Sequence, residues 1–157
     1  MKFLLQISAE LENVCSLRPD GNGGVNSVTM PYFFHLNCEK CGEITDEQCT
    51  YLNQRVNHKG KTYNHVLKCK GCDRVGTVKL ISGSGKEYTA ADSGAYVPLM
   101  VFDVEGLLMH RYVFNGGWEV FPVSGNSIKV NLVGGGFVGD GVAPPVVRNL
   151  RSRFVRK

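Results

Sequence analysis

Two CxxC pairs constrain this chain more than any other feature of its sequence. Cys38 and Cys41 form the first pair, and after 27 intervening residues Cys69 and Cys72 form the second pair. Two residues between a pair of thiolates let a tight turn direct both sulfurs at one ion, and two such turns supply four ligands. The spacing predicts a single metal site that ties two separated turns together.

Four thiolates close a tetrahedral coordination sphere and leave no position for water or substrate, so we expect the ion to stabilise the fold. We therefore predict one structural Zn²⁺ per chain. Iron bound as in rubredoxin remains an alternative because it accepts the same geometry. A pair of disulfides and redox-active CxxC motifs are further alternatives, although disulfides are rare inside cells and no βαβ pattern accompanies these cysteines.

Residues around the cysteines fit this interpretation. Gly42 and Gly71 stand where glycine eases a tight turn. Four basic residues flank the pairs and either compensate the thiolate charge or are ordinary solvated side chains: Lys40, Lys68, Lys70 and Arg74. The sequence alone does not separate these two roles.

The rest of the chain predicts β structure. Residues 3–12 alternate apolar and polar side chains, which is typical of a half-buried strand, and no long helix is predicted. Further strands are expected near residues 32–38, 50–56, 63–68, 75–81, 97–104, 107–114, 118–123 and 127–133. Residues 10–14 (ELENV) and 103–107 (DVEGL) share one pattern; five positions do not prove a duplication, but if the repeat is real, the second half is a copy of the first without the cysteine pairs.

The expected fold class is therefore all-β, with two similar sandwich- or barrel-like halves packed together. We assign residues 1–86 to the zinc-binding half, residues 87–142 to a second half without metal, and residues 143–157 to a basic tail for which disorder is one expectation. Five of the 18 basic residues lie in that tail without any acid. The remaining chain is close to neutral, so we expect no nucleic-acid footprint over the whole body.

No enzyme motif emerges from the sequence. The glycine clusters lack the residues that complete a phosphate-binding loop. Zinc-containing methionine sulfoxide reductases also carry two CxxC pairs, but they need a later reactive cysteine, and none follows Cys72. Cys15 and Cys49 are expected to be small buried side chains, and His35 and His65 to be polar packing residues. We predict no catalytic residue.

Several segments resemble the eukaryotic CXXC motif-containing zinc-binding protein family, a long-uncharacterised group. They are Leu11-Glu12-Asn13-Val14, Leu17-Arg18-Pro19, Cys38-x-x-Cys41-Gly42-Glu43 and Lys68-Cys69-Lys70-x-Cys72. The resemblance covers about residues 3–133 and implies an all-β protein of two similar halves with zinc on the first. It implies no enzymatic activity, and a link to a copper chaperone has been suggested for some members. The family usually ends in an acidic, aromatic segment, which this chain lacks.

These observations lead to one expected function and two alternatives. We expect a non-enzymatic, monomeric zinc protein of the cytoplasm, and also of the nucleus, that binds another protein and has metal handling as one potential role. No export signal or membrane-spanning run is found in the sequence. The first alternative is a nucleic-acid-binding zinc module that uses the basic tail, and the second is a redox enzyme that uses Cys15 or Cys49.

Overall fold

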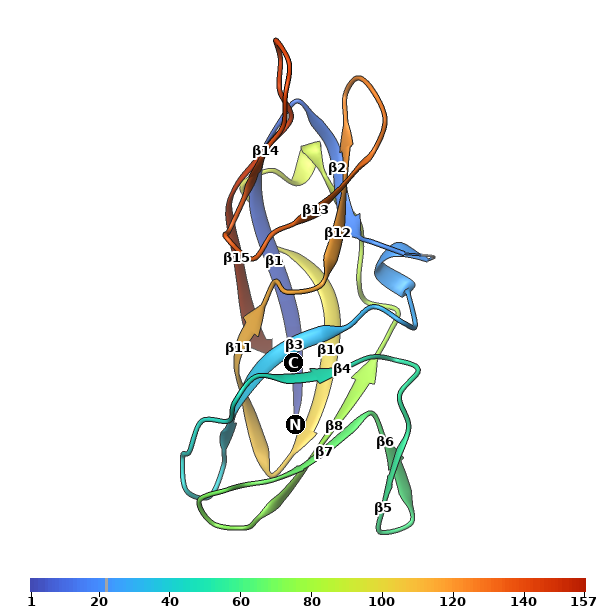
Figure 1. The fold of residues 1–157 in the computed structure, drawn as a ribbon. Helices are drawn as coiled ribbons and strands as arrows, with labels where there is room; N and C mark the ends of the chain where they lie inside the picture. The colour runs from blue at the N-terminus through green and yellow to red at the C-terminus, as the bar shows by residue number, and fades with distance from the viewer. Residues whose placement is uncertain (22) are drawn as a thin grey trace.

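The computed structural model describes residues 1–21 and 23–157 and is all-β, as predicted. Only two single-turn 3-10 helices, η1 (Gly24–Asn26) and η2 (Ala90–Asp92), interrupt the strands over these residues. Figure 1 shows an elongated molecule whose long central strands run along its length. No helix among the described residues has the length and hydropathy that a membrane span requires.

A six-stranded antiparallel sheet forms the body of the molecule. Its strand order is β14 (Phe137–Val138), β15 (Val146–Arg156), β1 (Lys2–Glu12), β10 (Val97–Glu105), β8 (Val75–Ile81) and β7 (His65–Lys68). The central pair is β1 with β10, in the register Leu5 opposite Met100. This sheet therefore joins the two ends of the chain to its middle.

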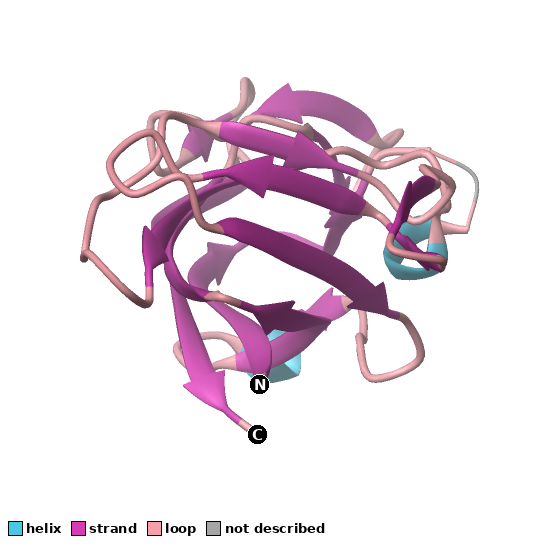
Figure 2. Ribbon diagram, turned by 90° about the horizontal axis from the view of Figure 1, so that it is seen from below, coloured by secondary structure: helices cyan, strands magenta, loops and turns pink. Residues whose placement is uncertain are grey.

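Two smaller sheets and a hairpin complete the fold. One sheet has the order β11 (Leu107–Val113), β3 (Tyr32–Cys38) and β4 (Gln48–Thr50). The other has the order β13 (Ile128–Asn131), β12 (Gly117–Pro122), β2 (Val14–Pro19) and β9 (Tyr88–Thr89). The hairpin consists of β5 (Val56–His58) and β6 (Lys61–Tyr63). Seen from below, the strands curve around a shared interior (Figure 2).

The two similar halves are related through the central strand pair. β1 continues into β2 after one residue with positive φ, Asn13, and β10 continues into β11 after Gly106, which also has positive φ. β2 pairs with β12 and β11 pairs with β3, and each of these partners is followed by a further antiparallel strand. The repeated sequence pattern at residues 10–14 and 103–107 thus marks two equivalent corners.

The boundaries of the halves differ from the predicted ones. β1 and β2, from the N-terminal part of the chain, pair with β15 and β12 from its C-terminal part, and β9 pairs back with β2, so the predicted halves exchange strands. The boundary at residue 86 does not separate two sheets. Local patterns cannot reveal this exchange, since it depends on which distant strands pair.

Most of the C-terminal segment, for which disorder is one expectation, forms a strand in the structure. Residues 146–156 form β15, which pairs along most of β1. Leu150 and Phe154 pack against the core, while Arg151 and Arg153 between them point to solvent. The alternation of apolar and basic side chains is that of a strand with one buried face.

Aromatic side chains fill the interior between the sheets. Phe102 of β10 is fully buried and makes edge contacts with Tyr32 and Phe34 of β3, with ring centroids 5.9 and 5.5 Å apart, and with Phe154 of β15 at 5.5 Å. Edge-to-face packing of this kind adds to the burial of apolar surface. Phe102 therefore joins the metal-bearing unit to the other sheet strands.

Candidate metal centre

All four predicted cysteines meet at one end of the molecule. Cys38 is the last residue of β3 and Cys41 follows it in the turn, while Cys69 and Cys72 lie in the turn between β7 and β8. The four sulfurs lie within 4.8 Å of one another. In Figure 1 the two turns lie side by side at the lower left.

The sulfur positions fit a tetrahedral metal site. Cys38 Sγ lies 3.6 Å from Cys72 Sγ, and Cys41 Sγ lies 3.5 Å from Cys69 Sγ. Four sulfurs at about 2.3 Å from a zinc ion are expected to stand about 3.8 Å from one another. A disulfide requires about 2.05 Å, so the alternative of two disulfides is excluded by this geometry, and all four thiols are free.

The two turns have the same backbone structure. We call residues 38–43 the first knuckle and residues 69–74 the second knuckle. In the first, Cys38 N donates to Glu43 O at 2.8 Å, and Gly42 N donates to Cys38 O at 2.9 Å. In the second, Cys69 N donates to Arg74 O at 2.8 Å, and Asp73 N donates to Cys69 O at 2.9 Å. Each CxxC pair is therefore preorganised by the same two hydrogen bonds.

Positive φ falls at the fifth position of each knuckle. Gly42 has φ 77° and Asp73 has φ 62°. The expectation that Gly71 eases its turn in the same way is not met, because Gly71 does not have positive φ. Its lack of a side chain instead gives room to the Glu43 carboxylate and the Cys41 sulfur, which a Cβ at Gly71 would crowd.

Substitutions at the two fifth positions should have different effects on stability. Gly42→Ala places a side chain in the left-handed region with no neighbour within 4 Å, so we expect it to lower the free energy of unfolding by about 1–2 kcal/mol through backbone strain alone. Asp73→Gly relieves the same strain and should leave stability unchanged or raise it. Urea unfolding of the two metal-loaded variants measures both. A destabilisation by Asp73→Gly as large as that by Gly42→Ala would contradict this account.

Backbone N–H groups favour a thiolate in the first knuckle. The N–H of Cys41, and that of Lys40, point at Cys38 Sγ and lower the pKa of that thiol to about 6. Glu43 N–H is the largest single influence on Cys41 and acts in the same direction, but the thiols of Cys69, Cys38 and Cys72 together with burial outweigh it and raise the pKa of Cys41 to about 12. Four thiols so close cannot all ionise without a cation between them.

Three of the four flanking cations pair with carboxylates. Lys70 Nζ lies 2.9 Å from Asp46 Oδ2, and this contact raises the pKa of Lys70 and lowers that of Asp46. Lys68 pairs with Asp73 at 3.8 Å, and a looser contact of 3.9 Å joins Arg74 Nη2 to Glu39 Oε2. These pairs are exposed and contribute little individually.

The two histidines near the knuckles have packing roles. His35 Nδ1 lies 2.9 Å from the carbonyl oxygen of Thr45, and His65 Nε2 lies 2.9 Å from Gln48 Oε1. Burial lowers the pKa of His65. The metal-ligand cluster found in residues 1–21 and 23–157 contains cysteines only.

The remaining cysteines differ from each other. Cys15 is exposed, contrary to the expectation of a buried thiol. Cys49 is intermediate in exposure, and its pKa is raised by burial and by the nearby Glu47 carboxylate. A raised pKa reduces the thiolate fraction on which cysteine reactivity depends.

A cavity that the sequence does not reveal adjoins the knuckles. It has a volume of about 280 Å³ and includes Ile44, Leu67 and Leu107 among apolar lining residues, with Asp46 and Lys70 among polar ones. Ile44 is 50% exposed although it is apolar. Its position beside Cys38 and Cys69 depends on the approach of β3 and β7, which no local pattern encodes.

Comparisons with known proteins agree with this arrangement. A family model described as "CXXC motif containing zinc binding protein, eukaryotic" matches residues 4–139. The UPF0587 protein CG4646 of Drosophila melanogaster is 32% identical over 120 residues, which are 74% of this chain and 70% of that protein. The human CXXC motif containing zinc binding protein is 33% identical over 109 residues, or 68% of this chain and 64% of that protein.

Solved structures show the same fold. The crystal structure of C1orf123 superposes with a TM-score of 0.83 at 27% identity and covers 100% of both chains. A hypothetical protein from Plasmodium falciparum superposes with a TM-score of 0.82 over 99% of both chains. Its identity of 15% supports a likeness of fold alone.

Proposed function

Because the chain belongs to the eukaryotic CXXC motif containing zinc binding protein family, we propose that its four clustered cysteines hold one structural zinc ion and that the end they stabilise is a docking scaffold for another protein. The ligands are Cys38, Cys41, Cys69 and Cys72. The observation that carries the proposal is the convergence of four sulfurs at distances suited to a tetrahedral ion.

The same convergence favours a structural role over catalysis. Four thiolates satisfy a zinc ion completely, so no position remains for water or substrate. Cys49, one of the two thiols outside the cluster, has a raised pKa, which disfavours a redox enzyme based on it. We propose a non-enzymatic protein of the cytoplasm and nucleus that acts as a monomer before it binds its partner.

The cavity beside the knuckles supports a protein partner. Its lining includes apolar Leu67 and Leu107 and charged groups such as Asp46 and Lys70, and Ile44, which also lines it, is half-exposed. Apolar surface surrounded by polar groups is typical of sites that bind other proteins. Because Cys38 and Cys69 also line this cavity, a bound metal would hold its walls in place. If metal binding determines the shape of the docking cavity in this way, a role in metal handling would follow.

Elemental analysis and partner capture test the proposal together. Protein purified without chelators should contain about one zinc per chain, and iron or a stoichiometry near zero would refute the metal assignment. For the scaffold, Ile44→Glu should keep the zinc and lose partners that the wild type captures from native cells. Val142→Glu is the control, because Val142 is fully exposed in a loop outside this cavity. Identical partners for wild type and Ile44→Glu would refute the docking surface.

A further inference from the structure

Positive charge is concentrated in one part of the chain. Residues 51–86 carry eight lysines and arginines against one carboxylate, Asp73, while the rest of the chain carries ten basic and thirteen acidic residues. The eight are Arg55, Lys59, Lys61, Lys68, Lys70, Arg74, Lys79 and Lys86. The net charge of the body outside the C-terminal segment is close to zero, but it is the sum of this strongly basic segment and acidic residues elsewhere. The basic segment includes the projecting hairpin β5–β6 (Figure 1).

Two basic cavities lie on either side of Tyr63. The first, of about 330 Å³, lies between the hairpin and the corner at Gly106. Its polar lining is His58, Lys59, Lys61, Tyr63, Arg74, Thr77 and Glu105. The second, of about 350 Å³, is lined by Arg55 and Lys79 together with Thr62, Asn64 and the same Tyr63. Tyr63 thus lies between two groups of cations, with Glu105 the one carboxylate lining either cavity.

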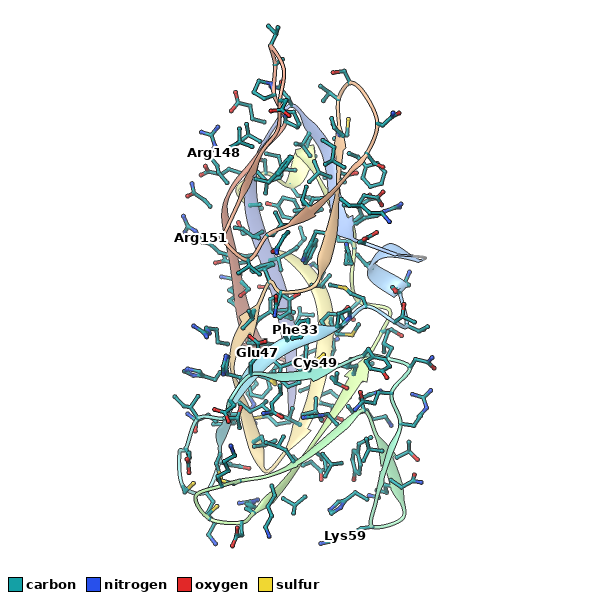
Figure 3. All side chains as sticks on the ribbon, viewed as in Figure 1. Phe33, Glu47, Cys49, Lys59, Arg148 and Arg151 are labelled. Carbon is teal, nitrogen blue, oxygen red and sulfur yellow. The ribbon has the colours of Figure 1, made fainter. Side chains whose placement is uncertain are left out.

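Several of these cations are free to bind an anion. Within residues 1–21 and 23–157, Lys59, Lys61 and Lys79 make no ion pair within 4 Å. Arg74 has a loose pair with Glu39 at 3.9 Å. Figure 3 shows Lys59 at the tip of the hairpin, far from Arg148 and Arg151 on β15. Charges this exposed and unpaired attract polyanions through the release of counterions.

An aromatic surface accompanies the charge. The Tyr63 ring is half-buried, and its centroid lies 6.4 Å from that of His58. A nucleic-acid base stacks on such rings whatever its identity. A single small anion would need one enclosed cation group, whereas here the cations are divided between two open cavities with an aromatic ring between them. This arrangement fits a chain of phosphates that carries bases.

We propose that the hairpin β5–β6 and the adjoining part of β8 bind single-stranded nucleic acid. Lys59, Lys61 and Arg74 hold one part of the phosphate backbone, Arg55 and Lys79 hold the next, and a base stacks on Tyr63. This site differs from the C-terminal segment that the sequence suggested, because β15 is a strand of the sheet and two of its arginines already have partners: Arg148 pairs with Glu12, and Arg153 lies over the Tyr96 ring at 3.9 Å.

Fluorescence anisotropy with labelled single-stranded RNA and DNA 12-mers, titrated with metal-loaded protein at several salt concentrations, tests the proposal. Lys59→Gln/Lys61→Gln should weaken binding at least tenfold and lower the slope of log affinity against log salt by about 1.5. Tyr63→Leu should weaken binding about fivefold and leave the salt slope unchanged, because stacking releases no counterion. Arg151→Gln/Arg156→Gln removes the same charge from β15 and should have little effect.

Three outcomes would overturn the proposal. The first is that no binding to the 12-mers is seen at about 50 mM salt, and the second is that the hairpin and β15 variants weaken nucleic-acid binding equally. The third is that Tyr63→Leu keeps the wild-type affinity while inorganic polyphosphate competes with the nucleic acid equally well. The last outcome would indicate a general polyanion surface. Zinc content and partner capture are measured on the same variants, and the hairpin lies outside the cavity of Ile44. Failure of nucleic-acid binding can therefore be distinguished from failure of the scaffold proposal.

Discussion

Cys69→Ser is expected to abolish metal binding and to unfold the protein at ambient temperature. Cys69 is buried, and its sulfur lies 3.5 Å from Cys41 Sγ in the cluster. Binding of a structural zinc ion can contribute about 10 kcal/mol or more to folding. A domain has a total stability of only about 5–15 kcal/mol, so most or all of it depends on the ion.

The unfolding should extend beyond the knuckles. β7 and β8 belong to the same sheet as β1 and β15, so loss of one edge exposes strands from both halves. Zinc analysis and thermal unfolding by circular dichroism measure the effect. Cys15→Ser is the matched control, since Cys15 is an exposed thiol outside the cluster. One zinc per chain and a wild-type melting temperature in Cys69→Ser would contradict the structural role of the metal.

Phe102→Ala should have the second largest effect, a loss of roughly 3–5 kcal/mol in the free energy of unfolding. Phe102 is fully buried and contacts rings from β3 and β15. The substitution leaves a cavity that the neighbouring rings on β3 and β15 cannot all move to fill. Because Phe102 is not one of the four ligands, the folded fraction should still bind one zinc.

Urea unfolding of zinc-loaded protein measures this loss. Phe121→Ala is the matched control: the Phe121 ring is partly exposed, and the Arg18 guanidinium lies over it, 4.6 Å from its centroid. We expect it to cost less than half as much as Phe102→Ala. Equal losses at the two positions would show that Phe102 does not join the sheets in the way the structure indicates.

The metal site was predictable because its chemistry is local and specific. Cysteines at CxxC spacing need only a tight turn to become a bidentate unit, and Cys38 and Cys69 begin two turns of identical hydrogen bonding. The long strand β1 was predictable for a similar reason, since its alternation extends over the whole strand. A pattern contained within one segment can be read without knowing which distant strand pairs with that segment.

Segments that depend on distant partners were missed or misplaced. β2 escaped detection because its pairing with β12 is irregular: Ser16 faces Phe121 and Val14 faces Pro122, so Cys15 interrupts the alternation. A strand was predicted over residues 50–56, but residues 51–55 form a loop. The amide of Asn64 donates to the carbonyls of Leu52 and Gln54 at 3.1 and 3.0 Å and holds the loop in place.

The surface properties were the least predictable. Whole-chain charge indicated a neutral body with a basic tail, but the fold places the tail in a sheet and gathers Lys59, Lys61 and Arg74 around one cavity. The cavity at Ile44 likewise depends on two strands that are separated in sequence. Such features are properties of the assembled sheets.

The pairing of β1 has a consequence for how the protein is made. β1 pairs with β10 on one side and with β15 on the other, so that Leu5 faces Met100 and Phe154. Because both partner strands come much later in the sequence, β1 is synthesised long before either of them. Until then its apolar face, which includes Ile7, has no native surface to cover it. Contacts so remote in sequence form slowly, and nascent chains of this protein should therefore depend on chaperones until translation reaches β15.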